Sequence, residues 1–333
     1  MPKIIKPAKG SFTLTDLSVD SDGRVYDASS GSAGGNFISA TGGDHTITEG
    51  DYKIHVFKSD ANLTVNAVGS GNPFSAVVDY MVVGGGGGAG YAGNLASGGG
   101  GGAGGYRASG GTHPDILGSG TMLPVSASPG TYPIVVGAGG GSGSNGGASS
   151  FSTITSAGGG GGSNSHQGSN GGSGGAPGRI PPYDVSTGNT PPVTPPQGNP
   201  GHQGGGGGAL GPAGFMSIWT PTATGYTKSG GLGIYSNIVA GGPQLSGVGG
   251  NAPTGTPANS MGLAMCAGGG GGGTSFGRGG GVIGGGTERS AGDSGDTNPG
   301  KAHTGSGGGA GASPTTPGGS GGAGLVCIRY KYQ

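Results

Sequence analysis

Alternating apolar and polar positions predict β-strands in the first quarter of the chain and at its end. Residues 52–57 and 63–65 alternate, and residues 76–83 form a nearly continuous apolar run. A period of two predicts half-buried strands, and a short apolar run predicts a strand buried on both faces. Residues 325–332 have the same character. We expect them to return and pair with residues 36–83, which completes a small β-sandwich.

The N-terminal segment, residues 1–35, is polar and predicts a separate unit. Apolar residues alternate at 17 and 19 and resume at 25, on either side of Asp22-Gly23. Asp-Gly between alternating residues is a typical hairpin turn. We therefore expect a short hairpin here.

Glycine runs dominate the rest of the chain, in residues 84–175 and again in 262–323. Residues 176–261 separate these two regions with paired prolines and scattered aromatic residues. No segment has the apolar spacing of a helix.

The composition is unusual for an ordered protein. It has 94 Gly and 23 Pro among 333 residues, a range typical of low-complexity or disordered chains. Collagen is excluded because no Gly-X-Y period is sustained. Extended three-fold glycine helices can instead lie side by side and hydrogen-bond sideways, although a flexible linker has nearly the same composition. We predict an all-β fold: a small β-sandwich plus a polyglycine-II-type slab with long loops and essentially no helix.

Charge and cysteine content argue against several classes of protein. Fourteen basic residues balance 14 acidic ones, so there is no basic footprint for nucleic acid. The longest apolar run is too short to span a membrane. Cys266 and Cys327 allow one bridge, but two reduced, buried thiols are the default expectation.

No pattern of catalytic or metal-binding residues stands out. Gly85, Gly87 and Gly90 match a dinucleotide fingerprint, but glycine follows where that motif needs a helix. The six histidines lack metal-ligand spacing. His166-Gln167-Gly168 and His202-Gln203-Gly204 both precede glycine segments and could mark equivalent ends of the slab, although ordinary solvated turn residues are the default interpretation. We expect no enzymatic activity, no cofactor and no metal.

Five aromatic residues on the loops of 176–261 are the candidate binding residues: Tyr183, Phe215, Trp219, Tyr226 and Tyr235. Loop aromatics stack on sugars or fill partner pockets. The alternative is a local core that pins the long insertion. The sequence leaves both interpretations open.

The order of strands and glycine runs resembles the glycine-rich domain of phage tail-fibre proteins over about residues 45–333. The resemblance lies in residues 77–88, 104–107, 132–140 and 324–330. The slab also looks like the polyglycine-sandwich adhesins at the fibre tips of T-even phages. Residues 18–25 are similar to the T-V-D-x-x-G-R-V element of trimeric phage fibres, with Ser18 in place of Thr.

The resemblance implies a virion protein, a tail fibre or adhesin that attaches the phage to its host. It implies a homotrimer, attachment to other virion proteins through Val19, Asp20, Gly23 and Arg24, and contact of the loops with a host surface glycan or protein. The alternative is a capsid decoration or head-fibre protein without a receptor role. Neither reading involves nucleic acid or membrane insertion.

Overall fold

The computed structural model describes residues 15–19, 25–30, 37–70, 74–91, 98–109, 119–178, 184–202, 205–209, 234–235, 265–266, 299–311 and 317–333. Every regular element among these residues is a β-strand, so the predicted all-β fold is confirmed. In this part of the chain no helix is long and apolar enough to cross a membrane.

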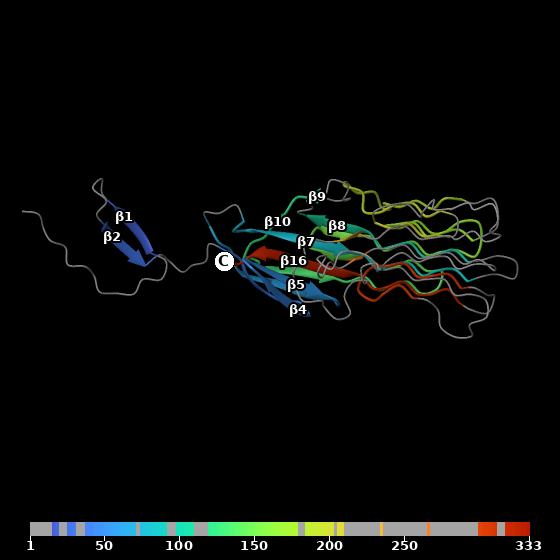
Figure 1. Ribbon diagram of the computed structural model, residues 1–333, viewed down its shortest axis with the longest axis horizontal. Helices are drawn as coiled ribbons and strands as arrows, with labels where there is room; N and C mark the ends of the chain where they lie inside the picture. The colour runs from blue at the N-terminus through green and yellow to red at the C-terminus, as the bar shows by residue number, and fades with distance from the viewer. Residues whose placement is uncertain are drawn as a thin grey trace, which may run out of the picture.

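Two sheets, antiparallel except for the β8–β9 pair, form the body (Figure 1). The larger sheet has the order β4 (His45–Glu49), β5 (Tyr52–Phe57), β16 (Leu325–Lys331), β7 (Val77–Val83), β8 (Tyr106–Ser109) and β9 (Ser119–Gly120), with β10 (Leu123–Pro124) also paired to β7. The smaller sheet has the order β13 (Ile154–Ser156), β12 (Ser149–Phe151), β11 (Thr131–Val135), β6 (Ala61–Ala67) and β3 (Ser39–Thr41).

The C-terminal strand lies in the middle of the larger sheet. β16 pairs antiparallel with β5 on one side and with β7 on the other, so that Val326 lies opposite both Phe57 and Val82. This pairing confirms that the end of the chain returns to the strands of residues 36–83.

Alternation along the strands divides the core into two clusters. Residues from both sheets, among them Phe57, Leu63, Phe151 and Ile328, form the cluster between the sheets. The opposite face of the larger sheet carries a second cluster, which includes Met81 and Leu325 together with Ala103 and Ala209 from glycine segments. Each of these clusters is an ordinary apolar core.

Several strands come from within the glycine-rich residues 84–175, where the sequence predicted no strand. β11 contains Pro133, and only Ile134 is buried on it; β12 and β13 have three residues each. Segments this short show no measurable period, which is why the alternation did not reveal them.

Two further pairs of strands form separate small sheets. β1 (Thr15–Val19) pairs antiparallel with β2 (Val25–Ser30), which confirms the predicted hairpin. β14 (Ile234–Tyr235) pairs with β15 (Met265–Cys266).

The glycine segments extend from the sheets as a hydrogen-bonded lattice, which we call the glycine lattice (Figure 1). Its central segment, residues 84–90, directly continues β7. The amides of residues 84, 87 and 90 donate to carbonyls of residues 99–105, those of 85 and 88 to residues 144–147, and those of 86 and 89 to residues 319–322. Every third residue therefore points to the same neighbour, as in a three-fold extended helix.

The carbonyls of the central segment follow the same rule with three other segments. Residues 85 and 88 accept from 159 and 162, residues 86 and 89 from 140 and 143, and residues 87 and 90 from 308 and 311, at 2.8–3.3 Å. The central segment is thus bonded to six neighbouring stretches. This network satisfies the backbone groups without side chains, as the sequence predicted.

Glycine is required here because neighbouring backbones approach closely. A Cβ atom on any of Gly84, Gly85, Gly86, Gly87 or Gly88 would lie closer than 3.0 Å to a carbonyl oxygen of a neighbouring segment. Real Cβ atoms essentially never come so near. A side chain at these positions would push the lattice apart.

The lattice continues beyond residue 175. The amide of Ala176 donates to Gly100 O, the amide of Ala103 to Gly207 O, and that of Gly207 to Gly174 O. Residues 197–202 and 205–209 are therefore lattice segments, although they lie between the proline pairs and aromatic residues of 176–261.

The body has two distinct ends. At the end we call the base, the chain enters at Phe37 and finishes at Gln333: the Lys331 Nζ lies 5.4 Å from the Phe37 ring, and Gln333 Nε2 donates to Gly50 O. At the opposite end, the tip, lattice segments turn at 141–144 and 163–168, and His202 pairs with Gly205 (Figure 1). Seven residues of three-fold helix place the tip about 20 Å beyond the sheets.

Candidate functional site: the tip of the glycine lattice

The turn at residues 141–144 shows how the tip is fixed. Ser142 Oγ donates to Ala89 O at 3.0 Å and accepts from the amide of Gly318 at 3.1 Å. Gly143 has a φ of +70° and its amide donates to Ala89 O. A positive φ favours glycine. One serine and one glycine therefore join three lattice segments at this turn.

The turn at residues 163–168 presents a row of polar side chains. Ser163 Oγ accepts from the amide of Ser165 at 3.0 Å, and the two serine hydroxyls lie 2.9 Å apart. The amide of Asp184 donates to His166 O at 3.1 Å. Ser165, His166, Gln167 and Asp184 are exposed.

The third turn carries His202. Its amide donates to Gly205 O, and the Gly205 amide donates back to His202 O, at 3.1 and 3.0 Å. The neighbouring Gly201 amide donates to Ser186 O. The first residues of both His-Gln-Gly motifs, His166 and His202, thus lie at turns of the lattice. That the motifs mark equivalent ends of the slab stays a prediction, because Gln203 and Gly204 lie outside the described residues.

The exposed side chains of the tip are chemically mixed. Tyr91 is 46% exposed and Val185 is 47% exposed, and Val185 follows Asp184, which pairs with Gln167. No group of three His, Cys, Asp or Glu side chains in the described residues could hold a metal ion. Short polar side chains and an aromatic ring on a rigid frame can bind a partner through hydrogen bonds and stacking.

The aromatic residues predicted as binding residues lie mostly outside the described part of the chain. Tyr183, Phe215, Trp219 and Tyr226 are outside it, and for Tyr235 the structure gives only the backbone, on β14. Their role stays a prediction. The neighbouring described residues 184–186 reach the tip beside residues 166–167 and 201.

The proposed attachment residues are likewise only partly covered. Val19 closes β1, opposite Val25 of β2. Asp20, Gly23 and Arg24 lie outside the described residues. Their role also stays a prediction.

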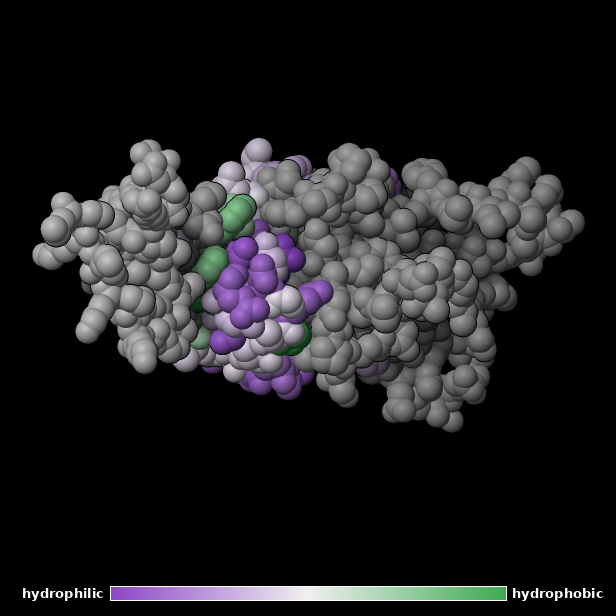
Figure 2. All heavy atoms as spheres, turned by 60° about the vertical axis from the view of Figure 1, so that its left-hand side comes forward, coloured by the Kyte–Doolittle hydropathy of each residue, from purple (hydrophilic) through white to green (hydrophobic). Residues whose placement is uncertain are grey.

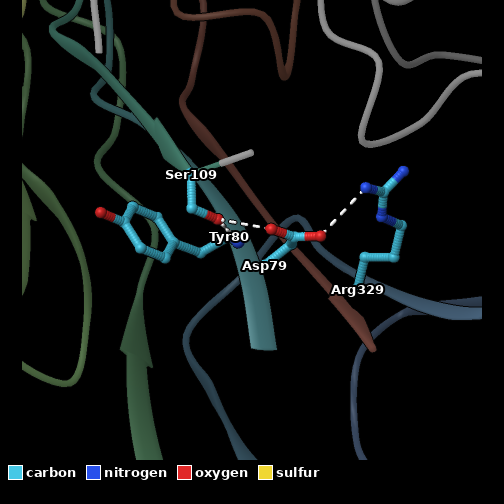
Figure 3. Close-up of polar contacts among 4 residues, drawn as sticks. All are labelled: Asp79, Tyr80, Ser109 and Arg329. Carbon is cyan, nitrogen blue, oxygen red and sulfur yellow. Dashed lines mark hydrogen bonds and ion pairs between the residues drawn. The ribbon is translucent and has the colours of Figure 1, made fainter. Parts of the chain in front are cut away.

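A buried polar cluster near the base joins three strands of the larger sheet (Figure 3). Asp79 Oδ1 accepts from Ser109 Oγ at 3.0 Å, and Oδ2 accepts from Arg329 at 2.9 Å. Ser109 Oγ also accepts from the Tyr80 amide at 2.9 Å. Because both carboxylate oxygens are engaged within the sheet, we assign this cluster to β7–β8–β16 pairing and not to catalysis.

A second polar group, which the sequence analysis missed, lies between the sheets. His55 Nε2 is 3.0 Å from Tyr330 Oη, and His55 Nδ1 is 2.6 Å from Gly42 O. Burial lowers the pKa of His55, Lys53 lowers it further, and the bond to Gly42 opposes both. Burial likewise raises the pKa of Tyr330. The available signal was a histidine between Ile54 and Val56 in an alternating strand.

The cysteine prediction is tested in part. Cys327 is fully buried on β16, within the outer-face cluster, as expected. The side chain of Cys266 is outside the described residues, so its pairing stays a prediction.

In the view that brings the base forward, the visible described surface is mainly hydrophilic, and hydrophobic side chains form small separate patches (Figure 2).

Comparison with known proteins agrees with the lattice. A family model described as a glycine-rich domain matches residues 66–331, which include β7, β16 and all the described lattice segments. No curated protein matches the chain.

Proposed function

The chain belongs to the family of glycine-rich domain proteins, and on that premise we propose that it is a phage virion protein, a tail fibre or adhesin that attaches to the host through its tip. In this proposal the N-terminal segment joins other virion proteins, and the chain assembles as a homotrimer. The ligand is a host surface glycan or protein, and the chain has no catalytic role.

The observation that supports this proposal is that the two ends of the body differ. The chain enters and ends at the base, whereas the described lattice turns gather at the tip. A protein that must be anchored at one end and touch a surface with the other needs this arrangement.

Rigidity of the lattice supports it further. Ordering a loop on binding costs about 0.5–1.5 kcal/mol for each immobilised side chain. Turns such as 141–144 are already fixed by Ser142 and Gly143. Preordered turns lower that cost, and several copies on a particle would add avidity.

Immunogold electron microscopy tests the location. Antibody raised against residues 176–261 is applied to intact virions of the phage that encodes the chain. We expect gold at the tail or fibre tip. Gold on the head would favour the capsid decoration alternative, and no labelling of any particle would contradict a virion protein.

A further inference from the structure

The strand through which the chain enters the body is weakly paired by its backbone. β3 has three residues, lies at the edge of the smaller sheet, and pairs only with β6. The pairing is irregular between Ser39 and Ala40. So short an edge strand contributes few ladder bonds to hold the entry point.

A side chain from the other sheet compensates. The amide of Ala40 donates to Tyr330 Oη at 3.2 Å, and the same hydroxyl lies 3.3 Å from Ala40 O. Tyr330 belongs to β16, which is paired along both edges at the centre of the larger sheet. Tyr330 is 2% exposed, so water does not compete for these bonds.

His55 orients the tyrosine. Its Nδ1 lies 2.6 Å from Gly42 O, a backbone acceptor, so Nδ1 carries the hydrogen and Nε2 is left to accept from Tyr330. The Tyr330 oxygen then accepts from Ala40. The ring of His55 also stacks on that of Tyr330, with centroids 5.6 Å apart.

The entry strand is thus held on both sides of Ser39. Before it, Lys331 lies over the Phe37 ring. After it, Ala40 and Gly42 are bonded by Tyr330 and His55. We call His55, Tyr330 and the Ala40 and Gly42 backbone groups the inter-sheet clamp.

We propose that the inter-sheet clamp carries tension from the N-terminal side of the chain into the central strand β16. β16 directly continues the lattice segment 317–324, whose amides and carbonyls bond to residues 86, 89, 137 and 140. Tension applied at Phe37 therefore passes through Tyr330 to the tip, instead of shearing β3 from β6. The assumption that tension acts between base and tip rests on the proposed function, whereas the clamp rests on the contacts described above.

Tyr330→Phe removes the hydroxyl and keeps the ring. We expect β3 to open up to about ten-fold more often, since the Ala40 amide loses its hydrogen bond to the Tyr330 oxygen. Hydrogen exchange of the β3 amides in the full chain measures this opening. His55→Gln, which leaves the tyrosine in place, should have a smaller effect in the same direction.

Tyr132→Phe is the matched control. Tyr132 Oη likewise binds the amide and carbonyl of a single residue, Ser126, at 2.6 and 3.3 Å, but Tyr132 belongs to β11, which pairs with β6 and not with β3. This substitution should leave β3 exchange unchanged. Equal effects of the two tyrosine substitutions would overturn the clamp.

Single-molecule pulling tests the mechanical role. Force is applied between an N-terminal handle and an azide-bearing residue in place of Gly141, at the tip, where an added side chain has open space. We expect Tyr330→Phe to lower the force of the first unfolding event and Tyr132→Phe to leave it unchanged. An unchanged force in Tyr330→Phe would contradict the proposal. A lowered force in a protein that does not adsorb to cells would retain the clamp and reject the proposed function.

Discussion

A methyl group on Gly88 would overlap the carbonyl oxygen of Gly141, whereas a methyl group on Gly141 would meet no atom within 4 Å. The two glycines are neighbours in space but have opposite requirements. Gly88 lies inside the central segment, and Gly141 lies at the surface where its segment turns. Glycine content alone therefore does not tell which glycines hold the lattice together.

This difference predicts unequal effects of two identical substitutions. Gly88→Ala should lower the free energy of unfolding by about 1–3 kcal/mol or more, because the neighbouring segment must move away. Gly141→Ala should change it by less than about 0.5 kcal/mol. Thermal and urea unfolding of the two variants measures both. Equal stability of the two would show that segments 84–90 and 137–141 are not packed as described.

The Asp79–Arg329 pair predicts a moderate loss on substitution. Asp79 is almost fully buried, with 5% of its side chain exposed, and Asp79→Asn would leave Arg329 without its carboxylate. We expect about 1–3 kcal/mol of lost stability. Asp51→Asn is the control, since the Asp51 side chain is 54% exposed and its pair with Lys331 should contribute about 0–1 kcal/mol. A loss no greater than the control's would contradict the structural role of the cluster.

Burial of His55 predicts a pH dependence of stability. Its folded pKa is lowered from 6.5, so below pH 6.5 the unfolded chain takes up a proton that the folded chain does not. Stability should therefore fall as the pH is lowered through and below 6.5. The slope should be shallower in His55→Gln.

His303, whose pKa is also lowered by burial, contributes in the same direction. The comparison is therefore made between the wild type and each single variant, His55→Gln and His303→Gln, by urea unfolding at several pH values. An identical slope in His55→Gln and the wild type would contradict the burial of a neutral His55.

Strands with a clear period could be predicted from the sequence. β5, β7 and β16 were predicted by alternation or by an apolar run, and the glycine runs predicted sideways backbone bonding. The short strands β11, β12 and β13 could not be predicted from the sequence, because they show no clear period and form by pairing with neighbouring strands in the sheet.

The contacts that define the inter-sheet clamp and the glycine lattice are non-local, so the sequence does not reveal them. His55 and Tyr330 are 275 positions apart. Similarly, the sequence placed residues 197–209 within a long loop. Their place in the lattice is set by distant partners, since Gly207 accepts from the Ala103 amide and donates to Gly174 O. Glycine spacing indicates that a segment can join the lattice, but it does not indicate which other segments it will bond to.

Because residues 176–261 contain lattice segments, deleting this region is a poor test of its loops. Deleting residues around 180–240 would remove segments 197–202 and 205–209 and damage the lattice itself. Point substitutions that leave the backbone intact are the sharper test.

We expect the predicted aromatic residues to affect adsorption without affecting stability if they contact the host. The variant carries serine at the five predicted positions: Tyr183, Phe215, Trp219, Tyr226 and Tyr235. Reduced cell binding with an unchanged melting temperature indicates surface contact. A lowered melting temperature indicates that these residues form a local core.

Competition for adsorption tests the central claim most directly. Host cells are incubated with purified chain and then with the phage, and the unadsorbed particles are counted. The wild-type chain should block adsorption, and so should a base variant with His45→Ser and Asp51→Ser. A tip variant with Tyr91→Ser, His166→Ser and Val185→Ser should block far less at equal stability. Failure of the wild-type chain to block, or equal blocking by the tip and base variants, would contradict host attachment through the tip.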